Sequence, residues 1–186
     1  MSIETDRARL LELLRTLSFE RRKVILASGK ESDFYVDCKR TALTAEGHVL
    51  VGRLLFDRVR AIQPLVRGVG GLTLGADPIA SAVALTSFLE GAPVDAFIVR
   101  KEPKGHGTGQ WIEGRKTIPD GSRVVVIEDV VTTGGSALKA IERCRAEKLE
   151  PVACLALVDR LEGGREAIEA QGVPLQALFT RKDFIP

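Results

Sequence analysis

Two adjacent carboxylates, Glu128 and Asp129, follow a run of β-branched residues and precede a loop rich in hydroxyls and glycines. Main-chain N–H groups at the start of a helix bind phosphate, and glycine lets the backbone approach it closely. Two acids would repel that phosphate, so we expect them to accept hydrogen bonds from a diol or to hold the water shell of a metal. The segment therefore predicts a site for a phosphorylated sugar. The alternative is a helix that Thr132 or Ser136 merely caps, with solvated acids beside it.

A second polar segment follows another buried strand. It carries three fixed cations, one imidazole and three glycines, and it has no hydrophobic periodicity; the charged members are Arg100, Lys101, Lys104 and His106. Such a segment predicts a loop that closes over a polyanion and excludes water. The alternative is a solvated basic loop. Other phosphate motifs are missing, because the chain has no GxxxxGK[ST] and the glycines at 105, 107 and 109 are not followed by a helical pattern.

The remaining pattern predicts the elements that position these segments. Strands are expected at 66–69, 96–99, 123–127, 152–158 and 175–179, and helices at 44–60, 77–89, 136–146 and 165–170, with Asp77 and Pro78 opening the second. An amphipathic helix near 3–17 and two short strands at 24–26 and 34–37, paired around a turn, come first. This alternation predicts an α/β fold with a largely parallel sheet flanked by helices. Ligands bind at the carboxyl ends of such strands, where 70–77, 100–115 and 128–136 converge.

Composition excludes several classes of protein. The 186 residues carry a net charge of +2, with 45% apolar and 28% charged residues, which is typical of a folded protein without a nucleic-acid surface. The chain has no apolar run of membrane-spanning length and opens on polar residues, so we expect a cytoplasmic protein without a signal peptide or membrane contact. Three cysteines, Cys38, Cys144 and Cys154, are expected to be buried or free thiols rather than zinc ligands.

The carboxylate–loop segment resembles the phosphoribosyl diphosphate signature of type I phosphoribosyltransferases. The loop that begins at Arg100 is similar to the catalytic loop of orotate phosphoribosyltransferases, and agreement continues at 27–30, 32–35, 75–80 and 159–160. The resemblance covers about residues 25–184. It implies the type I phosphoribosyltransferase fold as a single domain over 1–186, in which about 1–40 contribute an N-terminal helix and the hairpin of a small hood subdomain.

The resemblance also implies an activity and its site. The family transfers the 5-phosphoribosyl group from phosphoribosyl diphosphate to orotate, giving orotidine 5′-monophosphate and diphosphate in pyrimidine biosynthesis. It implies Mg²⁺, held mainly through diphosphate, ribose hydroxyls and water rather than directly by the protein, and a homodimer that shares the catalytic loop. The implied catalytic residues are Lys101, Lys104, His106 and Asp129. The implied orotate contacts are Thr132, Arg160, Phe34 and Tyr35. The implied phosphoribosyl diphosphate contacts are Arg100, Lys101, Lys104, His106, Glu128, Asp129, Val130, Val131, Thr132, Thr133, Gly134, Gly135 and Ser136.

Two positions depart from the family pattern. Many members carry lysine where this chain has Ala27 and Gly75, and Lys30, Arg40 or main-chain N–H groups are candidates to replace those charges. Two rival functions remain. One is a phosphoribosyltransferase for another base, which Arg160 disfavours because a guanidinium suits an acidic base. The other is a non-catalytic phosphoribosyl diphosphate sensor that regulates transcription or RNA, which the small net charge disfavours.

Overall fold

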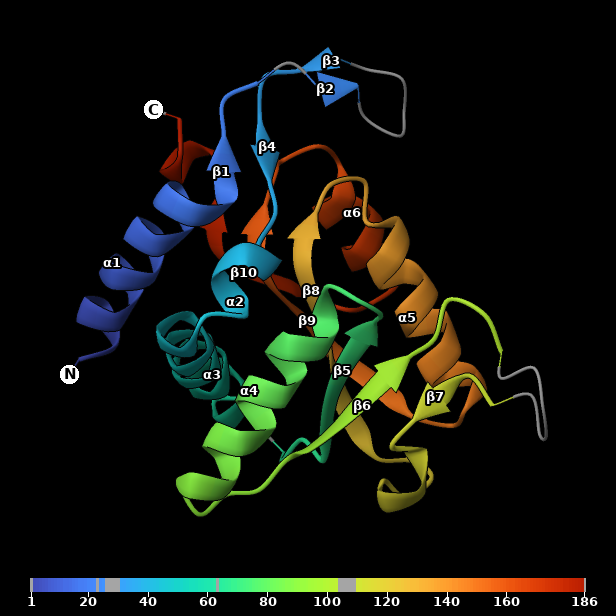
Figure 1. Cartoon of the computed structure of the whole chain (residues 1–186). Helices are drawn as coiled ribbons and strands as arrows, with labels where there is room; N and C mark the ends of the chain where they lie inside the picture. Colours follow the sequence, from blue (N-terminus) through green and yellow to red (C-terminus); the bar gives the residue numbers. More distant parts are fainter. Residues whose placement is uncertain (1, 23, 26–30, 63, 104–109, 186) are drawn as a thin grey trace.

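A six-stranded sheet forms the centre of the computed structural model, which describes residues 2–22, 24–25, 31–62, 64–103 and 110–185 (Figure 1). Its strands lie in the order β10-β9-β8-β5-β6-β7. Only β7 is antiparallel to its neighbour. The largely parallel sheet predicted from the sequence is therefore confirmed. The bounds are β5 (Gly68–Leu72), β6 (Asp95–Val99), β7 (Ile112–Glu113), β8 (Arg123–Val131), β9 (Glu150–Asp159) and β10 (Leu175–Thr180).

Helices cover both faces of this sheet (Figure 1). On β8, Val125 and Ile127 join one apolar cluster, and Val124 and Val126 join the other, because successive side chains point to opposite faces. The first cluster includes α1 (Ile3–Leu13), α3 (Ala45–Arg60) and α4 (Ala76–Leu89), and the second includes α5 (Gly135–Ala146) and α6 (Gly164–Glu169). Both faces are thus buried, as expected for β-branched strands without alternation.

The N-terminal segment forms a small unit beside the sheet. A π-helical turn, η1 (Leu14–Ser18), leads to β1 (Phe19–Glu20), β2 (Val24–Ile25), β3 (Glu31–Ser32), β4 (Tyr35–Val36) and α2 (Lys39–Ala42). The predicted pairing of two short strands around one turn is wrong, because β4 pairs with β1 while β2 pairs with β3. The apolar spacing of the opening helix runs into Phe19, which hid β1. We call residues 19–42 the hood.

Three boundaries differ from those predicted. The glycines after the predicted strand at 66–69 belong to β5 itself, because a Cβ on Gly70 or Gly71 would overlap a carbonyl oxygen of Phe97 or Ile127. Helix α4 begins at Ala76 with Gly75 as its N-cap, so Asp77 is not the capping residue. Strand β8 continues to Val131, which places both carboxylates inside the strand rather than beyond it.

Short 3-10 turns complete the fold at η2 (Arg115–Thr117) and η3 (Arg181–Asp183). The three cysteines are buried free thiols, as predicted, and burial raises the pKa of the Cys144 thiol to about 12. Within the described part of the chain, we find no helix with the length and apolarity that a membrane crossing requires.

Candidate active site

Glu128 and Asp129 occupy adjacent positions near the carboxyl end of β8. Glu128 is buried at 6% exposure, whereas the Asp129 side chain is 17% exposed. The Val130 N–H donates to Asp129 Oδ1 at 2.8 Å, and the Asp129 N–H donates to Glu128 Oε1 at 3.2 Å. The backbone of β8 therefore fixes both carboxylates before any ligand arrives.

Glu128 lies in a buried environment that disfavours its charged form. Burial raises the pKa of Glu128 well above that of an ordinary carboxyl, and its hydrogen bond with Asp129 raises the pKa further. The pair presents several acceptor lone pairs, an arrangement suited to a sugar diol.

The loop after β8 begins the N-terminus of α5. Gly134 is the N-cap residue with φ 84°, a left-handed conformation that favours glycine, and no side chain caps the helix. The alternative in which Thr132 or Ser136 serves as the cap is therefore wrong. Thr133, Gly135 and Ser136 are exposed at the start of a 12-residue helix. The loop thus presents hydroxyls and helix N–H groups to an anion, as predicted.

Gly164, which the sequence did not single out, supports this phosphate loop from behind. A Cβ on Gly164 would overlap the Thr132 carbonyl oxygen and would lie 2.9 Å from the Gly134 nitrogen. The loop can adopt its path only because position 164 has no side chain. The Gly163-Gly164 pair in front of a short helix was the available sequence signal.

A cavity of about 500 Å³ joins the turn after β5 to the end of β6. The Thr73 hydroxyl donates to Asp77 Oδ2 at 2.6 Å within this turn. The cavity is lined by Thr73, Asp77, Ile98, Arg100, Lys101, Glu102 and Glu113. Two predicted loop cations therefore face the same space as the turn, and Lys101 is exposed there. Lys104 and His106 lie outside the described residues.

The ends of the predicted catalytic loop lie side by side. Val99 of β6 pairs with Ile112 of β7, and the Arg100 N–H donates to the Trp111 carbonyl at 2.9 Å. The Arg100 guanidinium donates to Glu113 at 3.1 Å, so this cation is engaged at the base of the segment.

Arg160 lies at the end of β9, beside β8. Its N–H donates to the Val131 carbonyl at 2.9 Å, and its guanidinium lies 2.9 Å from Glu162 and 5.4 Å from the centre of the Phe34 ring. Phe34 is fully buried, packed with Phe19 and Phe184 at 5.1 and 5.5 Å between ring centres. The expectation that the Phe34 ring stacks on a base is therefore corrected, because that ring supports Arg160 instead.

Tyr35 and Lys39 bring the hood to the carboxylates. Tyr35 is half-buried, and the Arg22 guanidinium lies 4.1 Å from the centre of its ring. Lys39 Nζ lies 2.7 Å from Asp37 Oδ1 and 4.0 Å from Asp129 Oδ2. Sequence reasoning missed Lys39, because α2 is only four residues long and the contact spans 90 positions.

Arg40, one candidate to replace the charge of the family's lysines, is engaged within the hood. Its guanidinium pairs with Glu20 and lies 3.9 Å from Asp37. Lys30 and Ala27 lie outside the described residues. At Gly75, a Cβ would lie 2.5 Å from Asp129 Cγ, so the turn after β5 contacts the carboxylate directly. In the described part of the chain, the cation that lies nearest Asp129 is Lys39.

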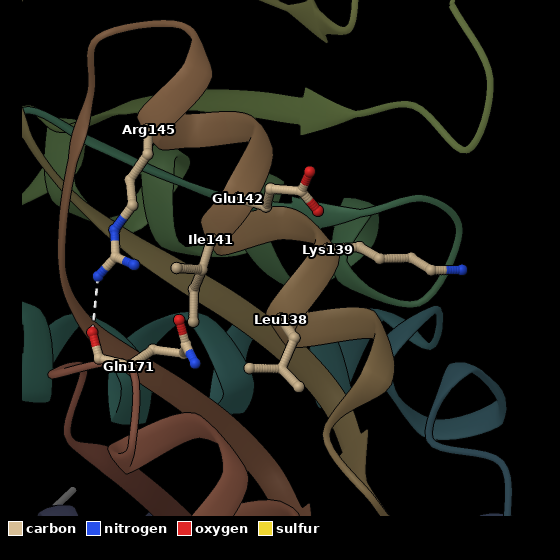
Figure 2. Close-up of a pocket in the computed structure, with 6 residues that line it drawn as sticks. All are labelled: Leu138, Lys139, Ile141, Glu142, Arg145 and Gln171. Carbon is tan, nitrogen blue, oxygen red and sulfur yellow. Dashed lines mark hydrogen bonds between the residues drawn. The ribbon is translucent and has the colours of Figure 1, made fainter.

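A second hollow lies away from these residues. Figure 2 shows it beside α5 and Gln171. Its volume is about 420 Å³. The Arg145 guanidinium donates to the Gln171 carbonyl at 2.7 Å. Its lining residues are Leu138, Lys139, Ile141, Glu142, Arg145 and Gln171. None of the predicted site residues is among them. Across the described ranges, no three His, Cys, Asp or Glu side chains are grouped to hold a metal ion.

Comparison with known proteins identifies the class and then the family. The profile of the phosphoribosyl transferase domain matches residues 59–171, which include β5, β8, the phosphate loop and Arg160. Fold and site together define a phosphoribosyltransferase.

Individual relatives identify the family of phosphoribosyltransferases. The orotate phosphoribosyltransferase of Sorangium cellulosum is 54% identical over 182 residues, covering 98% of this chain and 94% of the relative. A crystal structure of Mycobacterium tuberculosis H37Rv orotate phosphoribosyltransferase in complex with Fe(III) dicitrate is 42% identical, with TM-score 0.84 over 97% of this chain and 99% of that chain. The same protein in complex with 5-phospho-α-D-ribosyl 1-diphosphate gives 41% identity and TM-score 0.79 over 96% and 98%. The chain belongs to the orotate phosphoribosyltransferase family.

Proposed function

We propose that this chain transfers the 5-phosphoribosyl group from phosphoribosyl diphosphate to orotate, giving orotidine 5′-monophosphate and diphosphate for pyrimidine biosynthesis. The observation that carries the proposal is one juxtaposition. The carboxylate pair on β8, the phosphate loop at α5 and the buried Arg160 on β9 meet at the carboxyl ends of neighbouring strands, with the Arg160 N–H bonded to the Val131 carbonyl. Similarity to an orotate phosphoribosyltransferase over 98% of this chain, at 54% identity, supports the same function.

The β8 segment binds the ribose phosphate in this proposal. The N–H groups and hydroxyls of Thr132 to Ser136 donate hydrogen bonds to the 5′-phosphate at the N-terminus of α5. Val130 and Val131 connect the carboxylates to this loop. Asp129 and Glu128 take the two ribose hydroxyls. Gly164 keeps the loop in this path. These contacts orient C1′ toward the base. The entropy lost in aligning the two reactants is then met when the substrate binds, which lowers the activation barrier.

Breaking the C1′–O bond leaves positive charge on the ribose and additional negative charge on diphosphate, while a C1′–N bond to the base forms. We assign stabilisation of the leaving group to Lys101, Arg100, Lys104 and His106, of which the first two line the cavity beside Thr73 and Asp77. Bound Mg²⁺ would neutralise charge on the diphosphate. Because Glu128 and Asp129 alone are too few to cage this ion, it would be held mainly by substrate oxygens and water.

The base lies between β9 and the hood in this arrangement. Arg160 pairs with the orotate carboxylate, because a planar guanidinium matches a carboxylate in two parallel hydrogen bonds. Thr132 contacts the base from the loop side, and Tyr35 contacts it from the hood. The fully buried Phe34 ring holds the guanidinium in place from below.

A second copy of the chain belongs to the working enzyme. Large apolar side chains are exposed on and beside α4, namely Leu74, Leu85, Phe88 and Leu89 at 66%, 55%, 71% and 74%. A patch of this kind marks a protein contact. We propose a homodimer through it, with the catalytic loop shared between subunits. We also propose that residues 1–186 act as a single domain in the cytoplasm.

The test is a coupled absorbance assay with orotate, phosphoribosyl diphosphate and Mg²⁺, repeated with adenine, hypoxanthine, xanthine and uracil. We expect orotate consumption that stops when Mg²⁺ is chelated. Turnover of another base instead would overturn the Arg160 assignment. Tight binding of phosphoribosyl diphosphate without turnover of any base would favour the sensor.

A further inference from the structure

Three groups surround the Asp129 carboxylate. Buried Glu128 shares a hydrogen bond with it, the backbone of Gly75 leaves no room for a side chain on one flank, and Lys39 Nζ stands 4.0 Å from Oδ2 on another. Glu128 and Gly75 supply no positive charge. Within the described ranges, Lys39 is thus the cationic side chain that lies beside Asp129.

Lys39 is itself held by the hood. Its ammonium lies 2.7 Å from Asp37 Oδ1, and its own N–H donates to the same oxygen at 3.2 Å. The Asp37 N–H donates to the Ser18 carbonyl at 3.0 Å, which ties the pair to the end of the opening helix. The hydrogen bond with Asp37 raises the pKa of Lys39, so the ammonium stays charged. Its side chain is 39% exposed and its position is set from two sides.

The distance to Asp129 matters for the chemistry. At 4.0 Å the ammonium attracts the carboxylate without using one of its lone pairs in a hydrogen bond. Asp129 Oδ1 already accepts from the Val130 N–H, whereas Oδ2 faces Lys39. The oxygen that faces Lys39 therefore remains an oriented acceptor for a hydroxyl of the substrate.

We propose that Lys39 is a positioning residue, which holds Asp129 as an oriented acceptor for a ribose hydroxyl of phosphoribosyl diphosphate and thereby couples the hood to the ribose site. The inference rests on the proposed function, because it takes Asp129 as the ribose ligand. Lys39 also provides, from a different element, a positive charge beside the turn where the family's lysine is missing.

Steady-state kinetics of Lys39→Met tests this role. A half-exposed ion pair of this kind contributes modestly, so we expect KM for phosphoribosyl diphosphate to rise about fivefold while kcat and KM for orotate stay within about twofold. Lys39→Arg restores KM to within about twofold of wild type, because the charge is kept. Lys139→Met, the same change at an exposed site on α5 (Figure 2), leaves all three constants within about twofold.

A double-mutant cycle separates positioning from general disturbance. In an Asp129→Asn background, Lys39→Met should raise KM for phosphoribosyl diphosphate by less than about twofold, because its target is gone. The same fivefold rise in that background overturns the proposal, as does an unchanged KM in the single variant. Asp37→Asn serves as the second variant if Lys39→Met does not fold, and we expect the same KM to rise about threefold.

Calorimetric titration of the intact chain with phosphoribosyl diphosphate and Mg²⁺, without orotate, distinguishes this inference from the proposed function. If wild type binds phosphoribosyl diphosphate but turns over no orotate, the proposed function fails while Lys39 is still tested by Kd. A Kd for Lys39→Met equal to that of wild type overturns the role of Lys39 alone. Failure of wild type to bind overturns both.

Discussion

Neighbouring residues on one strand have different environments in this site. Glu128 and Asp129 share a backbone segment, yet Glu128 is 6% exposed whereas the Asp129 side chain is 17% exposed. Burial disfavours the charged form of Glu128 and raises its pKa. This burial predicts how stability depends on pH.

Replacement of Glu128 by glutamine should change that dependence. Burial raises the pKa of Glu128 above 4.5 in the folded protein, so the unfolded chain loses this proton first as pH rises. The stability that the protonated acid contributes is present below pH 4.5 and is lost as pH rises through the raised pKa. Glu128→Gln cannot ionise, so we expect its free energy of unfolding, relative to that of wild type, to rise as pH increases from 4.5 through the raised pKa of Glu128. Urea titrations at several pH values measure the difference, with exposed Glu142→Gln as control; a constant difference contradicts the assignment.

Replacement of Lys101 by alanine should lower the rate of turnover. It is exposed in the cavity that we assign to diphosphate, and charge on that group grows as the C1′–O bond breaks. Loss of a well-placed charge stabiliser costs about 3–4 kcal/mol, so Lys101→Ala should lower kcat by about 10²–10³-fold. Rapid-quench or coupled kinetics give the value. Lys116→Ala, exposed on η2, is the matched control, and turnover of Lys101→Ala within a few-fold of wild type removes the assignment.

At the scale of elements, two turns lie back to back. The turn before α6 contacts the phosphate loop before α5, and both approaches depend on glycine. Gly164→Ala pushes a methyl group against the Thr132 carbonyl, a strain of about 1–3 kcal/mol. We expect KM for phosphoribosyl diphosphate to rise about tenfold or more, since the loop must move. Ala167→Gly weakens α6 without crowding the loop, and an equal effect of both variants would show that helix stability alone matters.

Element by element, the long buried strands were predictable, whereas of the two-residue strands β1, β3 and β7 were not. Runs of apolar residues mark β6, β8, β9 and β10 in the sequence, because both faces of the sheet are buried. β1 and β7 have two residues each, too few for a period to be read. The glycines of β5 were expected to follow the strand, yet they belong to it and lie where neighbouring backbones leave no space for a Cβ. Contacts between elements, rather than local sequence pattern, therefore determine β1, β5 and β7.

At the scale of the molecule, the last residues close the fold. Figure 1 shows the C-terminal turn beside α1 and β1, and Phe184 packs on Phe19 and Phe34 with ring centres 5.6 and 5.5 Å apart. The Arg7 guanidinium donates to the Leu178 carbonyl at 2.9 Å. The hood therefore rests on both ends of the chain, and its position over the site depends on this cluster.

Removal of one ring tests that dependence. Phe184 is 7% exposed, and truncation of a buried phenylalanine costs about 3 kcal/mol. We expect Phe184→Ala to lose about this much free energy of unfolding in urea and to raise KM for orotate, because Phe34 supports Arg160. Leu65→Ala at an exposed position should stay within about 0.5 kcal/mol of wild type. A stability change of that small size at Phe184 would refute the closing role.

Some residues of the candidate site could be predicted from the sequence, and others could not. Glu128, Asp129 and the phosphate loop are contiguous, so their types and order were readable together. Arg160 followed from its place after the next strand. Lys39, Gly75 and Gly164 act through space on residues far along the chain, so the sequence does not show which residues they contact. The burial of Phe34 likewise depends on Phe184, 150 positions away.

The contact between Gly75 and Asp129 constrains how this enzyme can evolve. A Cβ at position 75 would lie 2.5 Å from Asp129 Cγ, so a larger residue there requires the Asp129 side chain or the turn after β5 to shift. Lys39 faces the same carboxylate from the hood. We therefore expect substitutions at 39 and 75 to have non-additive effects, because both act on one carboxylate. The order in which such substitutions occur then influences which charge arrangements lineages of this enzyme can reach.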